Sequence, residues 1–121
     1  MTFHTVLKNP EELKAILQTN PSWVILKFSA TWCGPCKKIQ PIVTPWIQQL
    51  TDSKPNVQIY LLDIDENFEI YGYLKNRKRL NGIPAILAYK KGNIDVIPDY
   101  YVAGTNKEQY DAFFQSILNQ S

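Results

Sequence analysis

The sequence predicts an α/β fold in which a mixed central sheet of about five strands is flanked by about four helices. The first reason is the order of its elements, which alternate strand and helix before a β-hairpin and a last helix. The second is the apolar, β-branched run Trp23–Phe28, which is typical of a central strand covered on both faces. Since no repeat or linker interrupts the 121 residues, we expect residues 1–121 to form a single domain.

The first half of the chain is predicted to hold two strands and two helices. Phe3–Leu7 is expected to be a short first strand. Asn9, Pro10 and Glu12 then supply an N-cap, a proline at the first helical position and an acid at the third. After the strand Trp23–Phe28, a long amphipathic helix is indicated by apolar residues at helical spacing, namely Ile39, Ile42, Val43, Trp46, Ile47 and Leu50.

The second half continues with a buried strand over Val57–Leu62 and a helix over about Asn67–Lys75. Ala85–Tyr89 and Ile94–Ile97 are expected to pair as a β-hairpin across a turn that contains glycine. Thr105–Glu108 has the pattern of a capping box and opens a last helix. The apolar face of that helix comprises Tyr110, Phe113, Phe114, Ile117 and Leu118.

The composition limits the classes of partner. The chain is 45% hydrophobic and 20% charged, and its net charge of +2 is too small to indicate nucleic-acid binding. The N-terminus lacks a basic start followed by a long apolar stretch, and no apolar run approaches the roughly 20 residues of a membrane span. We therefore expect a cytoplasmic protein with neither a nucleic-acid nor a membrane partner.

The two cysteines, Cys33 and Cys36, are the candidate site. They follow a predicted buried strand and open a helix, whose unpaired amides and partial positive charge favour a thiolate at Cys33. Cys36 lies one turn further on and can reach Cys33, while Gly34 and Pro35 keep the turn compact. A zinc site would need two more ligands, and the chain offers only His4, so we expect a reactive dithiol without metal or cofactor.

The string Trp32-Cys33-Gly34-Pro35-Cys36-Lys37 resembles the active-site motif of the thioredoxin family. Pro41 follows at the family's spacing, as do Ile83-Pro84 and Gly104, so the resemblance covers nearly the whole chain. It implies the thioredoxin fold and the reduction of protein disulfides, in which Cys33 attacks and Cys36 resolves the mixed disulfide. It also implies a cis bond at Ile83-Pro84, a docking ledge for substrate there, and Trp32 beside it.

The resemblance further implies partners. These are disulfide-containing protein substrates and a thioredoxin-reductase-like flavoenzyme or another dithiol donor, with the protein itself a monomer. Two alternatives stay open. One is a disulfide oxidase or isomerase of the protein-disulfide-isomerase kind, and the other is a non-enzymatic binding subunit that uses the thioredoxin surface.

Lys27 is the main departure from the family pattern, which has a buried aspartate six residues before the first cysteine and a lysine near the position of Leu61. Lys27 either extends its ammonium to the surface or stays near Cys36, where it modulates the pKa of that thiol by stabilising the thiolate or serves as a neutral amine base. Asp63 is a candidate counter-ion. The basic segment Lys75–Arg79 is interpreted either as a helix end or as a steering patch for an acidic partner.

Overall fold

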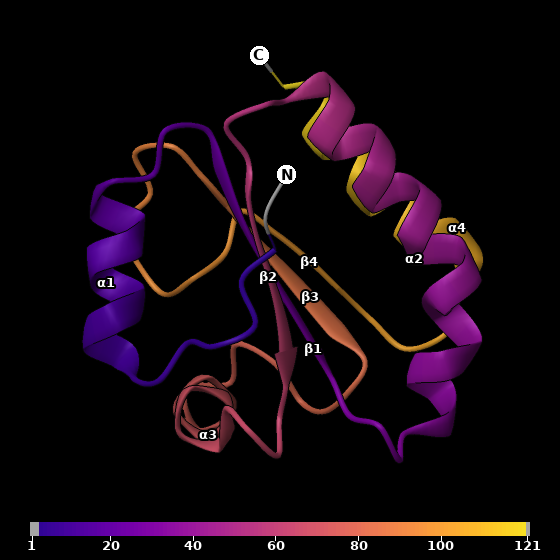
Figure 1. The fold of residues 1–121 in the computed structure, drawn as a ribbon, viewed down its shortest axis with the longest axis horizontal. Coiled ribbons are helices and arrows are strands. Elements are labelled where there is room, and N and C mark those ends of the chain that lie inside the picture. The colour runs from indigo at the N-terminus through magenta and orange to yellow at the C-terminus, as the bar shows by residue number, and fades with distance from the viewer. Residues whose placement is uncertain (1–2, 121) are drawn as a thin grey trace.

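Four strands form one mixed sheet in the computed structural model, which describes residues 3–120 (Figure 1). The order across the sheet is β2-β1-β3-β4. β1 is parallel to β2 and antiparallel to β3, which is antiparallel to β4. The bounds are Trp23–Ser29 for β1, Gln58–Asp63 for β2, Ala85–Lys90 for β3 and Tyr100–Ala103 for β4. The predicted mixed sheet is confirmed, with one strand fewer.

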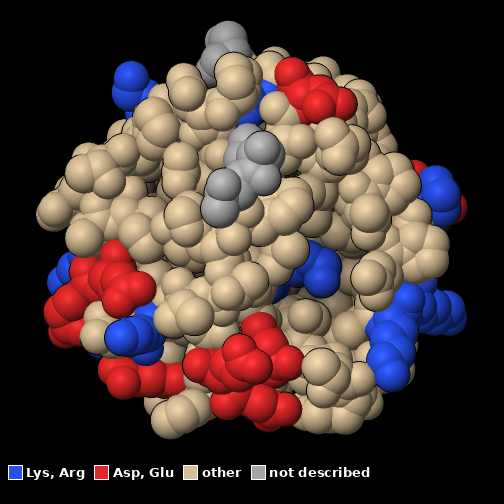
Figure 2. All heavy atoms as spheres, viewed as in Figure 1, with Lys and Arg blue, Asp and Glu red and all other residues tan. Residues whose placement is uncertain are grey.

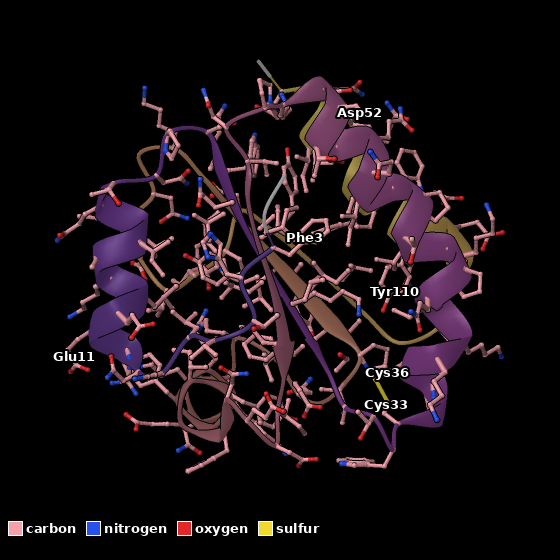
Figure 3. All side chains as sticks on the ribbon, in the orientation of Figure 1. Phe3, Glu11, Cys33, Cys36, Asp52 and Tyr110 are labelled. Carbon is pink, nitrogen blue, oxygen red and sulfur yellow. A yellow bond between two sulfur atoms is a disulfide. The ribbon has the colours of Figure 1, made fainter. Side chains whose placement is uncertain are left out.

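Helices cover both faces of this sheet (Figure 1). α1 (Pro10–Gln18) and α3 (Phe68–Asn76) lie on one side, and α2 (Gly34–Ser53) and α4 (Lys107–Leu118) on the other. Side chains fill the space on both sides of the strands (Figure 3). Within residues 3–120, none of the helices has the length and apolarity needed to cross a bilayer.

The face seen in the orientation of Figure 1 carries both signs of charge. Figure 2 shows acidic and basic side chains in separate small groups on a surface that is mostly uncharged. An extended basic surface, the electrostatic feature that binds nucleic acid, is not present among the described residues on this face.

The predicted strand over Phe3–Leu7 is wrong, because the segment makes only an isolated parallel bridge between His4 and Tyr60. In a parallel pair the next bonds to β2 after His4 would come from Val6, and the described residues show none there. The segment is held instead by a side chain, because Asn67 Oδ1 accepts from the Leu7 amide at 2.8 Å and Asn67 Nδ2 donates to the Thr5 carbonyl at 3.2 Å. Asn67 is almost fully buried and ties this segment to the start of α3.

The second hairpin strand lies at Tyr100–Ala103, and the prediction for Ile94–Ile97 is wrong. Asn93 and Asp95 each accept a hydrogen bond from the backbone amide two residues further on, at 2.9 and 3.2 Å. Such turns compete with strand pairing. The carboxylate of Asp99 also accepts from the amide of the last residue of β3 at 2.7 Å, and β4 begins at the next residue.

The starts of α1 and α4 are set by asparagines. Asn9 caps α1 by accepting from the Glu12 amide at 2.9 Å, as predicted. For α4 the predicted capping box beginning at Thr105 is displaced by one residue, because Asn106 is the N-cap and accepts from the Gln109 amide at 3.0 Å. Asparagine is the stronger N-cap residue, which accounts for the shift.

The basic segment Lys75–Arg79 closes α3. The Lys78 amide donates to the Lys75 carbonyl at 3.0 Å and the Arg79 amide to the Leu74 carbonyl at 2.9 Å. Lys78 has φ 58°, the left-handed conformation that ends many helices and that glycine normally supplies. The segment therefore forms the C-terminal end of α3.

Candidate redox site

The disulfide joins Cys33 to Cys36 at the N-terminal end of α2 (Figure 3). Cys33 is the N-cap of the helix, and the Cα atoms of the pair are 5.3 Å apart. The chain reaches this point directly from β1, the central strand. The fold thus places both cysteines just after an inner strand of the sheet.

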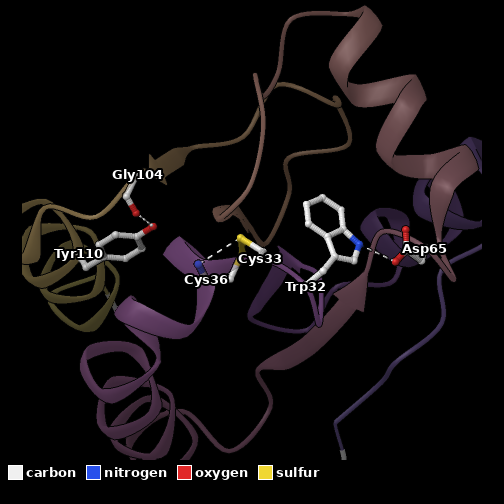
Figure 4. Close-up of a disulfide and its surroundings, with 6 residues drawn as sticks. All are labelled: Trp32, Cys33, Cys36, Asp65, Gly104 and Tyr110. Atoms are coloured by element: carbon white, nitrogen blue, oxygen red, sulfur yellow. Dashed lines mark hydrogen bonds between the residues drawn. A yellow bond between two sulfur atoms is a disulfide. The ribbon is translucent and has the colours of Figure 1, made fainter.

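The local electrostatics differ between the two sulfurs. Cys33 Sγ accepts a hydrogen bond from the Cys36 amide at 3.1 Å (Figure 4). The amides and dipole of a helix N-terminus stabilise negative charge at that position. Exposure does not separate the two residues, since Cys33 is 4% and Cys36 5% exposed.

Trp32 lies beside the disulfide and is 65% exposed. Its indole Nε1 donates to Asp65 Oδ2 at 2.8 Å, which orients the ring next to Cys33 (Figure 4). Asp65 was not singled out from the sequence. A signal existed, because β1 and β2 are parallel, and residues just after two neighbouring parallel strands lie at the same edge of the sheet.

The Ile83-Pro84 peptide bond is cis, as predicted. Ile83 packs with Ile64 against a small cluster formed by Ala30 and the two cysteines. The Pro84 carbonyl accepts from the Gly104 amide at 3.3 Å. The segment before β3 is therefore held directly beside the disulfide.

Tyr110 supports this arrangement from α4, a role that was not predicted. Its hydroxyl donates to the Gly104 carbonyl at 2.7 Å (Figure 4). Burial raises the pKa of Tyr110 to about 12, which keeps the hydroxyl protonated and able to donate. Gly104 has φ 86°, a conformation that favours glycine, so it turns the chain from β4 towards α4.

Lys27 lies on β1 opposite Leu61 of β2 and is half-buried. Burial lowers the pKa of its ammonium below the ordinary lysine value. Lys27 and Cys36 line the same cavity of about 400 Å³. Asp63 lines it too, but the sole ion pair within residues 3–120 joins Lys107 to Asp111, so Asp63 is not salt-bridged to Lys27.

Residues 4–116 match the family model described as thioredoxin. The chain belongs to the thioredoxin family. The match begins at His4, which makes the bridge to Tyr60, and ends within α4, so it includes every element that forms the site.

Individual thioredoxins are similar over most of their length. Thioredoxin-2 of Saccharomyces cerevisiae is 32% identical over 88 residues, which cover 73% of this chain and 77% of that protein. Mouse (Mus musculus) thioredoxin is 30% identical over 99 residues, covering 82% and 83%. The solved oxidized form of mitochondrial thioredoxin 3 from S. cerevisiae superposes with a TM-score of 0.66 at 26% identity, covering 93% of this chain and 94% of that one.

The protein is thus a thiol-disulfide oxidoreductase and a disulfide reductase of the thioredoxin family, with Cys33 and Cys36 as its redox-active pair. Its substrates are disulfides, and a reductase donor returns the pair to the dithiol. The disulfide drawn in Figure 4 corresponds to the oxidised half of that cycle.

Proposed function

We propose that Cys33 is the attacking thiol and Cys36 the resolving thiol in the reduction of protein disulfides. The Cys33 thiolate attacks one sulfur of a substrate disulfide and releases the other sulfur as a thiolate. Cys36 then attacks Cys33 Sγ, the second substrate thiolate leaves, and the Cys33–Cys36 disulfide forms. Two electrons pass from the pair to the substrate.

The position of Cys33 at the N-terminus of α2 carries this assignment. A thiolate there is stabilised by the helix dipole and by the Cys36 amide that already bonds Cys33 Sγ at 3.1 Å. Cys36 lies inside the first turn, where its own amide is used in that bond. The more stable thiolate therefore belongs to Cys33.

We propose that a substrate segment docks across Trp32, Gly34, Pro35, Ile83 and Pro84. The support is their common location around the disulfide. Trp32 and the Gly34-Pro35 turn are exposed, and Ile83 packs against the cysteine cluster. A Pro84→Ala variant should lose turnover of protein disulfides while its cysteines still react normally with a small disulfide reagent.

We infer that the net direction in vivo is reduction, with electrons supplied by a thioredoxin-reductase-like flavoenzyme or another dithiol donor. The test is the reduction potential of the pair together with the reduction of insulin disulfides. A potential near −270 mV is typical of a thioredoxin and about −180 mV of a disulfide isomerase. A value near the isomerase figure with slow insulin reduction would overturn the inferred direction.

We also propose that residues 1–121 form one domain that acts as a monomer in the cytoplasm. The family match over residues 4–116 supports one domain. Sedimentation of the purified protein and imaging of a tagged copy test the other two statements. A dimer in solution, or a mitochondrial location of the tagged copy, would contradict them.

A further inference from the structure

Lys27 is on the face of the sheet that is directed towards α2. Trp23 and Ile25 of the same strand belong to the core between the sheet and the pair α2–α4. Since alternate residues of a strand share a face, Lys27 and Ser29 are on that face as well. Lys27 occurs where the apolar core ends and the first turn of α2 begins.

The cavity beside Lys27 has polar and apolar lining residues and brings together groups from three elements. Its lining comprises Lys27, Ser29, Ala30, Thr31, Cys36, Lys37, Gln40, Leu61 and Asp63. Three of these carry charge, namely Lys27, Lys37 and Asp63. Asp63 is held in place by the Asp65 amide, which donates to its Oδ1 at 2.8 Å. A cavity of this size and polarity accommodates water.

The Lys27 ammonium is in an unfavourable environment in the oxidised protein, in which Cys33 and Cys36 are joined. It is half-buried and has no salt bridge within the described residues, and burial lowers its pKa. An unpaired cation at a partly buried position costs free energy. The disulfide is neutral, so it offers no compensating charge.

Reduction changes this environment, because Cys36 becomes a thiol that can ionise into the same cavity. We infer that the Lys27 ammonium stabilises the Cys36 thiolate and thereby promotes the resolving step. The inference rests on the proposed role of Cys36. In the step itself the Cys36 proton passes to cavity water, Cys36 Sγ bonds Cys33 Sγ, and the bond from Cys33 Sγ to the substrate sulfur breaks. The departing substrate thiolate takes a proton from solvent.

The experiment separates attack from resolution with an aromatic disulfide reagent, dithiobis-nitrobenzoate, in stopped flow. Attack by Cys33 releases the first coloured thiolate, and attack by Cys36 on the resulting mixed disulfide releases the second. Lys27→Met should leave the first phase unchanged and slow the second near neutral pH. For each unit by which the Cys36 pKa rises, the thiolate fraction falls tenfold and its nucleophilicity rises about threefold, so the expected slowing is about threefold.

Lys27→Arg distinguishes a cation from a proton-accepting amine. Arginine keeps the charge but does not deprotonate, so the second phase should stay within about twofold of the wild type. Lys38→Met is the matched control, because Lys38 lies close to Cys36 in α2 but is exposed and does not line the cavity. Its second phase should be unchanged.

A separate measurement does not depend on turnover. In a Cys33→Ser background, Cys36 is the single thiol, and its pKa is read from the pH dependence of alkylation. Adding Lys27→Met should raise that pKa, and adding Lys27→Arg should restore it, which a merely structural role would not do. Circular dichroism on each variant identifies any that fail to fold. If the Met variant does not fold, the Cys36 pKa of the Arg variant still tests the role of the charge.

An unchanged Cys36 pKa and an unchanged second phase in folded Lys27→Met would overturn the inference. So would an Arg variant as slow as the Met variant, because the amine would then act as a base. The proposed roles of the cysteines are tested independently, since Cys36→Ser abolishes the second phase only if Cys36 resolves. The two failures are therefore distinguishable.

Discussion

Cys33 and Cys36 are equally covered in the oxidised protein, so their reactivity is set by charge rather than by access. Limited alkylation of the reduced protein near neutral pH should therefore modify Cys33 first, because the N-terminus of α2 stabilises its thiolate. Peptide mass spectrometry gives the site of labelling. Cys36→Ser should also accumulate a mixed disulfide through Cys33. Faster labelling of Cys36 would reverse the proposed roles.

Lys27 gives a second prediction at the same scale, measured on the oxidised protein so that no thiol titrates. Its folded pKa is depressed by burial, whereas in the unfolded chain it has the ordinary value of 10.5. The unfolded state therefore binds the proton more tightly, so burying the charged lysine lowers the free energy of unfolding. This destabilisation is fully present below the folded pKa and disappears as the pH rises through 10.5. Lys27→Met should raise the free energy of unfolding at pH 7 by about 1 kcal/mol.

Denaturant titrations at neutral pH and above pH 10 measure this effect. The gain from Lys27→Met should shrink at the higher pH, because the wild-type lysine loses its charge there. Lys38→Met is again the control, since Lys38 is exposed and its charge stays in water. A gain that is independent of pH would show that apolar contacts, and not the ammonium, explain it.

Among the elements, α3 ends in an unusual way. Its left-handed terminal residue is Lys78 rather than glycine, and a side chain costs about 1 kcal/mol in that conformation. Lys78→Gly should raise the free energy of unfolding by about 0.5 to 1 kcal/mol. Lys78→Ala removes the charge but keeps Cβ, so it should bring no such gain. Equal stabilisation by both variants would assign the effect to charge.

Two cores, one on each side of the sheet, hold the whole molecule together. Ile86 and Leu87 are neighbours on β3 and both fully buried, but Ile86 packs on the α2–α4 side and Leu87 on the α1–α3 side. Because both faces are covered, Ile86→Ala and Leu87→Ala should each lower the free energy of unfolding by about 2 to 5 kcal/mol. Denaturant unfolding measures both. A loss well below this range at one position would mean that its core contributes little.

Much of the fold was predictable because its signals are local. The apolar run of β1, the helical spacing after Cys36 and the N-cap at Asn9 each depend on a few neighbouring residues. The redox pair was predictable for the same reason, since its spacing and its place at a helix start need no distant partner. The cis bond at Ile83-Pro84 was expected from the family resemblance.

What the sequence by itself determined is the set of elements and the chemistry of the cysteine pair, because periodicity, capping and spacing act within one or two turns of the chain. Only the tertiary structure decided where distant backbone groups find partners. Asn67 accepts from the Leu7 amide, and the Asp99 carboxylate accepts from the amide of Lys90 at the end of β3. The Trp32–Asp65 bond and the cavity shared by Lys27 and Cys36 likewise join residues from separate elements. Such contacts depend on how the elements pack against one another, and that packing exists only in the folded chain.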